Sequence, residues 1–232
     1  MYSLVVFAKE PVAGEVKTRL TPPLTSAEAA ILYTAFVEDT CATIAAASEP
    51  GDRRVLAAPG GTGSVLARIA KEYGFETAAQ EGADLGARMA HALGVELARG
   101  AHAAVVVGTD SPAMPAVDVR DALRLAGEKA PRAVLGPARD GGYWLIGASG
   151  RMPDLFAGIP WSTPDVLPAT LERAKLRGVE VVLARHGYDV DDAADLRFLE
   201  AELERNPSLS PRTRAAIAVL RSLDSGFFRG GT

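Results

Sequence analysis

Short apolar runs alternate along the chain with longer segments rich in Ala, Leu, Glu and Arg, and this alternation restricts the fold more than any other feature. Continuous apolar runs are typical of strands that are buried on both faces. Such runs lie at 4–8, 55–58, 103–107, 133–135, 143–146 and 179–183. Helical patterns lie at 26–47, 64–73, 84–99, 117–127 and 164–177, with a last helix near 211–223. The alternation predicts an α/β/α sandwich with a mostly parallel central sheet.

Polar residues at the starts of several helical segments fit helix caps. Two pairs have the spacing of a capping box, in which each side chain bonds a free backbone N–H of the first turn. These pairs are Thr25 with Glu28 and Asp192 with Asp195. Thr163 and Ser210 each precede a proline, which is favoured at the first helical position.

Length and composition set limits on the class of protein. For 232 residues one domain is the default, and we expect it to span residues 1–205, with a helical tail at 206–232 packed on it. The net charge of −4 argues against a sequence-independent nucleic-acid binder. A single cysteine excludes an internal disulfide or a multi-thiolate metal site and favours a reducing compartment. We see neither a signal peptide nor an apolar run of the about 18–20 residues that span a membrane, so we expect a cytoplasmic protein.

A basic loop follows the first predicted strand. It contains Lys9, Gly14, Lys17 and Arg19, and it precedes the first long helix. Cationic side chains at a strand end neutralise a di- or triphosphate and donate hydrogen bonds to it. We therefore expect a nucleotide phosphate site here, although a solvated surface loop has the same composition. Arg88, near the start of a later helix, is a further candidate for binding an anion.

Acidic residues follow two other predicted strands. Asp110 comes directly after the strand at 103–107, where its carboxylate can hold Mg²⁺ or Mn²⁺. Asp189 and Asp191 follow the strand at 179–183, and their alternate positions place both on one face of an extended segment. Either of these two aspartates can serve as a second metal ligand beside Asp110. The alternative for each segment is an acidic cap of a turn or helix.

A glycine pair and two aromatic residues are the candidates for an acceptor site. Asp140 is our first candidate for a general base and Asp189 our second. Gly141 and Gly142 permit a close backbone approach to a ligand, and Tyr143 and Trp161 offer aromatic rings. The alternative is an Asp-Gly hairpin turn between two strands, and both interpretations can hold together.

In combination these motifs resemble a known family. They are Phe-Ala-Lys-x-Pro-x-x-Gly-x-x-Lys-Thr-Arg-Leu at 7–20, Gly-Thr-Asp-Ser-Pro at 108–112, Gly-Pro-x-x-Asp-Gly-Gly-Tyr at 136–143, Ile-Pro-Trp-Ser-Thr-Pro at 159–164 and Asp-Val-Asp-x-x-x-Asp-Leu at 189–196. The chain resembles the bacterial DUF2064 family, also called selenodomain-associated transferase 1, over roughly residues 3–200. That family belongs to the GT-A superfamily of nucleotide-diphospho-sugar transferases. More distantly, the chain is similar to guanylyltransferases of the 2-phospholactate and molybdenum-cofactor pathways.

The resemblance implies a GT-A fold with a nucleotide site in the N-terminal half. It also implies a Mg²⁺ or Mn²⁺ ion between the diphosphate and Asp110, with Asp191 as the second carboxylate and Lys17 and Arg19 on the phosphates. Two departures leave the reaction open. The Asp-x-Asp of many glycosyltransferases is Thr109-Asp110-Ser111 here, and the Gly-Gly-x-x-x-Arg loop of many nucleotidyltransferases is missing.

Three functions therefore remain. The first is transfer of a glycosyl group from a nucleotide sugar to a small acceptor, which the missing glycine-rich loop favours. The second is nucleotidyl transfer that joins a nucleoside triphosphate to a phosphorylated small molecule. The third is a non-catalytic nucleotide-binding module. The sequence does not indicate an oligomeric state.

Overall fold

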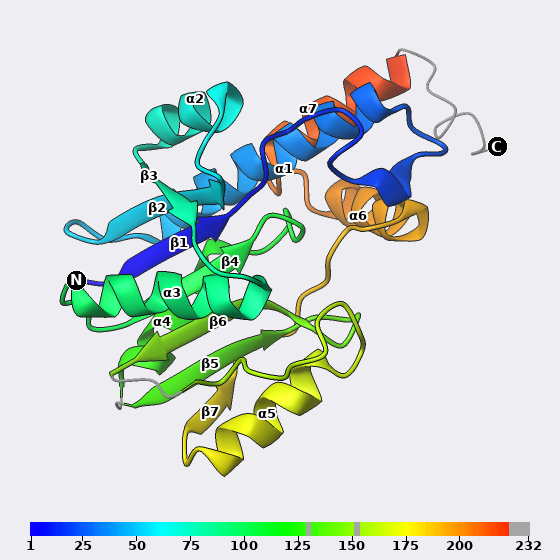
Figure 1. Cartoon of the computed structure of the whole chain (residues 1–232). Helices are drawn as coiled ribbons and strands as arrows, with labels where there is room; N and C mark the ends of the chain where they lie inside the picture. Colours follow the sequence, from blue (N-terminus) through cyan, green and yellow to red (C-terminus); the bar gives the residue numbers. More distant parts are fainter. Residues whose placement is uncertain (129–130, 151–153, 223–232) are drawn as a thin grey trace.

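A computed structural model describes residues 1–128, 131–150 and 154–222 and contains one seven-stranded sheet in the order β3-β2-β1-β4-β6-β5-β7 (Figure 1). The strands are β1 (Ser3–Phe7), β2 (Arg53–Pro59), β3 (Glu76–Gln80), β4 (Ala104–Gly108), β5 (Arg132–Pro137), β6 (Tyr143–Ser149) and β7 (Glu180–Leu183). β6 is antiparallel to its neighbours β4 and β5, and every other pair is parallel. This confirms the mostly parallel mixed sheet.

Helices cover both faces of the sheet. They are α1 (Ser26–Ala47), α2 (Ser64–Tyr73), α3 (Leu85–Ala98), α4 (Ala116–Gly127), α5 (Val166–Leu176), α6 (Ala193–Arg205) and α7 (Pro211–Ser222), with a short 3₁₀ turn η1 (Thr18–Leu20). Side chains alternate across each strand, so Leu4 and Val6 of β1 pack in the core beneath α1, α2 and α4. Val5 and Phe7 pack in the opposite core, beneath α3 and α5.

Both predicted capping boxes are present in the structure, at Thr25–Glu28 and at Asp192–Asp195. The predicted cap at Thr163 is wrong, because α5 begins two residues after Pro164 and has Asp165 at its N-cap position. Thr163 instead donates its hydroxyl to the carbonyl of Pro160 at 2.7 Å, within the loop before the helix.

The sequence analysis did not predict β3. This strand lies at the edge of the sheet and is mostly exposed or half-buried, so it lacks the apolar run by which the other strands were found. Its last residue, Gln80, stands beside the site described below.

The long helix α1 joins the C-terminal part of the chain to the sheet. In Figure 1 the red α7 runs alongside α1, and Ile217 and Leu220 are buried with α1 side chains in one core. Asp39 of α1 accepts hydrogen bonds from Arg212 N and Thr213 N, so it caps the start of α7. Of the tail predicted at 206–232, residues 223–232 lie outside the described part of the chain.

Among the described residues, α1 is the one helix whose length and composition would suffice to cross a membrane. More than half of that stretch is buried within the fold, where it contacts α2, α4 and α7. Cys41 lies in this helix and is buried.

Candidate functional site

The loops after β1, β3, β4, β5 and β7 surround a cavity of about 720 Å³ at the carboxyl end of the parallel strands. This is the edge at which ligands bind in open α/β sheets. Most of the site residues predicted from the sequence line it: Lys9, Lys17, Arg19, Arg88, Asp110, Asp140, Gly142, Tyr143, Trp161, Asp189 and Asp191. Gly14 and Gly141 are not among the lining residues.

Three charged residues from distant parts of the chain meet in the cavity. The Lys17 ammonium forms an ion pair with Asp110 Oδ1 and a second one with Asp191 Oδ1, at 3.1 Å. The backbone brings the two carboxylates together, because Val190 N donates to the carbonyl of Asp110 at 2.8 Å. The sequence analysis assigned the two aspartates to one metal but did not predict that Lys17 lies between them.

The Lys17 side chain is held in a buried position. It is 4% exposed, and its ammonium lies 5.7 Å from the centre of the Phe36 ring. Burial alone would lower the pKa of Lys17, but the charges of Asp110 and Asp191 outweigh it and raise the pKa above its usual value. The backbone of Lys17 is left-handed (φ 48°), a conformation that costs a non-glycine residue about 1–2 kcal/mol. Such strain is concentrated at functional sites.

The other predicted phosphate-binding residues stand around this centre. Arg19 is 75% exposed, and its Nη1 lies 3.7 Å from Asp191 Oδ2. Arg88 donates from Nε to the carbonyl of Gly82 at 3.3 Å, and Lys9 is exposed on the loop after β1. Gly14 adopts a positive φ of 85° in the turn that leads to Lys17, so it shapes the loop rather than lining the cavity.

Asp189 is half-buried in the cavity, and its Oδ1 accepts a hydrogen bond from the Ser111 hydroxyl at 2.5 Å. Burial raises the pKa of Asp189 to about 7, and the nearby charges of Asp110 and Asp140 act in the same direction. A cation bound beside it would lower this pKa again. Asp189 therefore takes up a proton more readily than an ordinary carboxylate does.

Asp140 lies in the hairpin between β5 and β6, as the Asp-Gly pattern indicated. Its Oδ1 accepts from Gly142 N at 2.9 Å, which fixes the carboxyl group at the cavity wall. Gly141, beside it, has a structural role in this hairpin, and its approach to a ligand stays a prediction. Its φ is 89°, and a Cβ there would lie 2.2 Å from the carbonyl oxygen of Pro164, so this glycine lets the hairpin pack on the segment before α5.

Two aromatic rings form one side of the cavity. Tyr143 and Trp161 meet edge to face, with ring centres 6.4 Å apart. The Trp161 ring also packs on Gly86, where a Cβ would lie 2.5 Å from the indole. Burial raises the pKa of the Tyr143 hydroxyl, which lies against Thr170 of α5. Tyr143 therefore offers its ring to the cavity rather than its hydroxyl.

The structure adds two polar residues that the sequence analysis missed. The Tyr33 hydroxyl accepts from Lys9 N at 2.9 Å and lies 2.9 Å from Thr109 Oγ1, so it joins the loops after β1 and β4. Gln80 donates from Nε2 to the carbonyls of Ala8 and Ala57. Tyr33 lies within a helical pattern and Gln80 in an unpredicted edge strand, and neither had a local signal for this placement.

A glycine-rich segment, residues 60–63, precedes α2, and the side chain of Glu10 caps the helix that follows it. Glu10 accepts hydrogen bonds from Val65 N and Leu66 N, at 2.8 and 3.4 Å, and its carboxylate packs against Gly63. A carboxylate there satisfies the helix N-terminus and opposes its positive dipole. The first turn of α2 is thus capped within the protein.

The centre of the cavity has the donor chemistry that Mg²⁺ or Mn²⁺ requires. Asp110 and Asp191 supply carboxylate oxygens that converge on one positive charge, the Lys17 ammonium. Among the described residues no group of three or more His, Cys, Asp or Glu side chains forms a complete metal site. Mg²⁺ is commonly held by one or two carboxylates together with water and substrate phosphates, so the residues fit such an ion.

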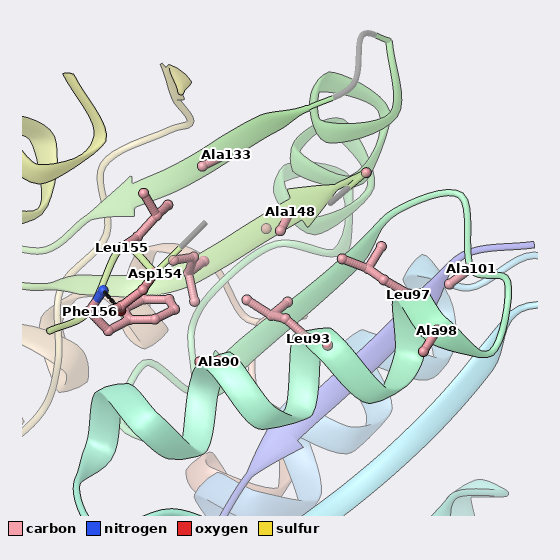
Figure 2. Close-up of a pocket in the computed structure, with 14 residues that line it drawn as sticks. Ala90, Leu93, Leu97, Ala98, Ala101, Ala133, Ala148, Asp154, Leu155 and Phe156 are labelled. Carbon is pink, nitrogen blue, oxygen red and sulfur yellow. Dashed lines mark hydrogen bonds between the residues drawn. The ribbon is translucent and has the colours of Figure 1, made fainter. Parts of the chain in front are cut away.

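A second cavity, of about 630 Å³, lies between α3 and the sheet (Figure 2). Its lining is apolar apart from Asp154, whose carboxylate accepts from Phe156 N and Ala157 N and pairs with Arg173. None of the candidate functional residues lines this cavity.

The DUF2064 family model, described as an uncharacterized protein conserved in bacteria, matches residues 41–163, which is just over half of the chain. The chain therefore belongs to the DUF2064 family. No curated protein matches it.

Among solved structures, the chain is similar to a "putative nucleotide-diphospho-sugar transferase" from Desulfovibrio desulfuricans G20. The two are 32% identical with a TM-score of 0.83, over 97% of this chain and 96% of the other. Two less similar structures share the fold. The 4-diphosphocytidyl-2C-methyl-D-erythritol synthase of Anaerococcus prevotii is 11% identical (TM-score 0.55, covering 88% and 96% of the two chains). The glucosyl-3-phosphoglycerate synthase of Mycobacterium tuberculosis, solved with Mn²⁺ and UDP, is 14% identical (TM-score 0.52, covering 95% and 78%). These neighbours confirm the GT-A, nucleotidyltransferase-like fold.

Proposed function

We propose that this protein is a metal-dependent transferase that passes a glycosyl group from a nucleotide sugar to a small acceptor. One observation carries the proposal: two carboxylates, Asp110 and Asp191, converge in a cavity that also contains Lys9, Lys17, Arg19 and Arg88. Oxygen donors for a divalent cation beside several cationic side chains suit a nucleoside diphosphate. The similarity to the Desulfovibrio protein supports the same class.

One set of residues binds the nucleotide donor, and another set contacts the sugar or acceptor. Lys17, Arg19, Lys9 and Arg88 neutralise the donor phosphates. A Mg²⁺ or Mn²⁺ ion on Asp110 and Asp191 would add charge stabilisation to the departing nucleoside diphosphate. Tyr143 and Trp161 provide aromatic surface for a sugar or acceptor, and Gly142 lines the same wall.

In the transfer, the acceptor oxygen bonds to the anomeric carbon and the bond from that carbon to the diphosphate breaks. The nucleoside diphosphate leaves with the bonding electrons, and a carboxylate takes the acceptor proton. Asp140 and Asp189 are the two candidates for this base, because both line the cavity. Asp140 has one oxygen bound to Gly142 N, which leaves the other for the acceptor.

The missing Gly-Gly-x-x-x-Arg loop favours glycosyl over nucleotidyl transfer. The leaving group separates the two reactions, since glycosyl transfer releases a nucleoside diphosphate and nucleotidyl transfer releases pyrophosphate.

A thermal-shift panel tests the proposal, with nucleotide sugars set against nucleoside triphosphates, each with and without Mn²⁺. A ligand at 100 times its dissociation constant adds about 2.7 kcal/mol, which for this chain length raises the midpoint by about 5–10 °C. We expect a Mn²⁺-dependent shift with a nucleotide sugar. A shift confined to one triphosphate would favour nucleotidyl transfer. Binding with no turnover of any acceptor would favour a non-catalytic module, and no shift at all would contradict both transferase functions.

A further inference from the structure

Lys17 lies where the proposed function requires a divalent cation. Its ammonium pairs with Asp110 Oδ1 and Asp191 Oδ1, which are the oxygens that a bridging metal ion would use. The lysine side chain is 4% exposed, whereas the side chains of Asp110 and Asp191 are 47% and 42% exposed. The carboxylates are thus open to the cavity on one side and neutralised by a buried cation on the other.

The remaining oxygen of Asp191 also faces a positive charge. Arg19 Nη1 lies 3.7 Å from Asp191 Oδ2. Mg²⁺ binds carboxylate oxygens at about 2.0–2.1 Å, so an ion on the pair would stand close to the Lys17 ammonium and be repelled by it. The metal and the lysine therefore compete for the same negative charge.

A phosphate group can resolve this competition. The diphosphate of a nucleotide supplies anionic oxygens for Lys17 and further oxygen ligands for the metal. Lysine suits such an exchange, because its ammonium is a compact charge on a flexible four-carbon stem. The turn that contains Lys17 is bordered by exposed residues, including Glu15, Thr18 and Arg19, and it lines the cavity.

We propose that Lys17 is an internal cation that gates metal binding: it neutralises Asp110 and Asp191 until nucleotide phosphates draw its ammonium away and a divalent cation takes its place. The inference rests on the proposed function and deepens it. Metal and nucleotide then bind as a coupled pair, and each raises the affinity for the other. Lys17 acts as a positioning residue with two successive partners, the carboxylates and the phosphates.

The test measures Mn²⁺ binding directly, from the electron paramagnetic resonance signal of free Mn²⁺, with no nucleotide present. We expect Lys17→Gln to bind Mn²⁺ at least tenfold more tightly than the wild type, because the competing charge is gone. Lys9→Gln is the matched control. It removes one positive charge from the same cavity, but Lys9 forms no ion pair with either carboxylate, so its Mn²⁺ affinity stays within about threefold of wild type.

Thermal unfolding gives a second readout that needs no activity. Without Lys17 the two carboxylates lack their buried partner, so we expect a lower midpoint for Lys17→Gln and a larger rise on adding Mn²⁺ than in the wild type. Lys17→Met repeats the experiment with an apolar stem that preserves packing on Phe36. Equal Mn²⁺ affinity in the wild type and both variants would refute the proposal that Lys17 competes with the metal.

Addition of UDP or GDP separates this inference from the proposed function. If the wild type binds Mn²⁺ more tightly with either nucleotide, and Lys17→Gln shows a clearly smaller gain because no competing ammonium has to be drawn away, the gating proposal is supported. If the nucleotide enhances Mn²⁺ binding equally in both proteins, the gate fails while the transferase proposal stands. If Mn²⁺ binds neither protein under any condition, the metal site and both proposals fail.

Discussion

At the scale of single residues, charge holds the centre of the cavity together and hydrogen bonds hold its surroundings. Lys17 attracts both Asp110 and Asp191, and the three residues come from separate loops. Tyr33 fixes two of those loops, because its hydroxyl contacts both Lys9 N and Thr109 Oγ1. Substitutions at the charged residues should therefore act mainly on ligand binding, with a smaller loss of stability, and substitutions at Tyr33 should act mainly on stability.

We expect Asp110→Asn to abolish Mn²⁺-dependent stabilisation by the donor nucleotide and to leave the fold intact. Asparagine keeps the size of the side chain but removes the negative charge that a divalent cation needs. Lys17 retains Asp191, and the Asp110 side chain is 47% exposed, so the free energy of unfolding should fall by less than about 2 kcal/mol. Thermal shift with and without Mn²⁺ measures both effects. Asp121→Asn, an exposed charge on α4, is the control, and full activity in Asp110→Asn would refute the metal assignment.

We expect Tyr33→Phe to lower the free energy of unfolding by about 1–3 kcal/mol, because Lys9 N and Thr109 Oγ1 lose a buried partner. Urea unfolding of Tyr33→Phe, Thr109→Val and the double variant measures the coupling between the two side chains. A coupling energy above about 0.5 kcal/mol is expected. If the single effects simply add, the hydroxyl pair does not join the loops.

At the scale of elements, the β5–β6 hairpin carries Asp140 and Gly142 to the cavity, and its position depends on the segment before α5. Leu167 N donates to the carbonyl of Gly141 at 2.9 Å, and the backbone of Pro164 packs where a Gly141 side chain would be. The hairpin and α5 are thus joined at the residue beside Asp140.

Gly141→Ala should destabilise the protein more than Gly158→Ala does. Both glycines have positive φ values, 89° and 75°, so both substitutions carry the strain of about 1–2 kcal/mol for a left-handed residue. Only at Gly141 would the new Cβ collide with backbone; at Gly158 no atom lies within 4 Å. Denaturant unfolding of the two variants isolates the cost of the collision. Equal losses would mean that the hairpin moves freely away from Pro164.

The sequence predicted the elements with strong local signals and missed those that depend on tertiary contacts. The apolar runs identified β1, β2, β4, β5 and β6, because strands buried on both faces cannot be polar, and they also identified β7, an edge strand that is exposed or half-buried. The edge strand β3 needs no such run. Within the site, too, the sequence predicted what has a local signal and missed what depends on tertiary contacts. Position after a strand placed Asp110 and Asp191 in the cavity, but the ion pairs of Lys17 and the contact of Gly141 with Pro164 join residues far apart in the chain.

At the scale of the whole molecule, the site depends on both ends of the chain. The loop after β1 contributes Lys17 and the segment before α6 contributes Asp191, and these residues meet at the carboxyl end of the parallel strands. The stretch after α6 then returns to α1 through α7. If the tail is packed on the same domain, as predicted, the contact between α7 and α1 helps to hold α6 in place. Asp191 lies directly before α6, so its position depends on the same contact.

We expect α7 to unfold together with the rest of the protein, so that damage to its buried face lowers the stability of the whole chain. Leu220 is fully buried in the core shared with α1, whereas its neighbour Val219 is 51% exposed. Leu220→Ala should cost about 2–5 kcal/mol in a single unfolding transition, and Val219→Ala should cost less than about 1 kcal/mol. Circular dichroism at 222 nm and tryptophan fluorescence should report the same midpoint. Two separate transitions in Leu220→Ala, the first without a change in fluorescence, would show that α7 is an independent unit and that the site does not rely on it.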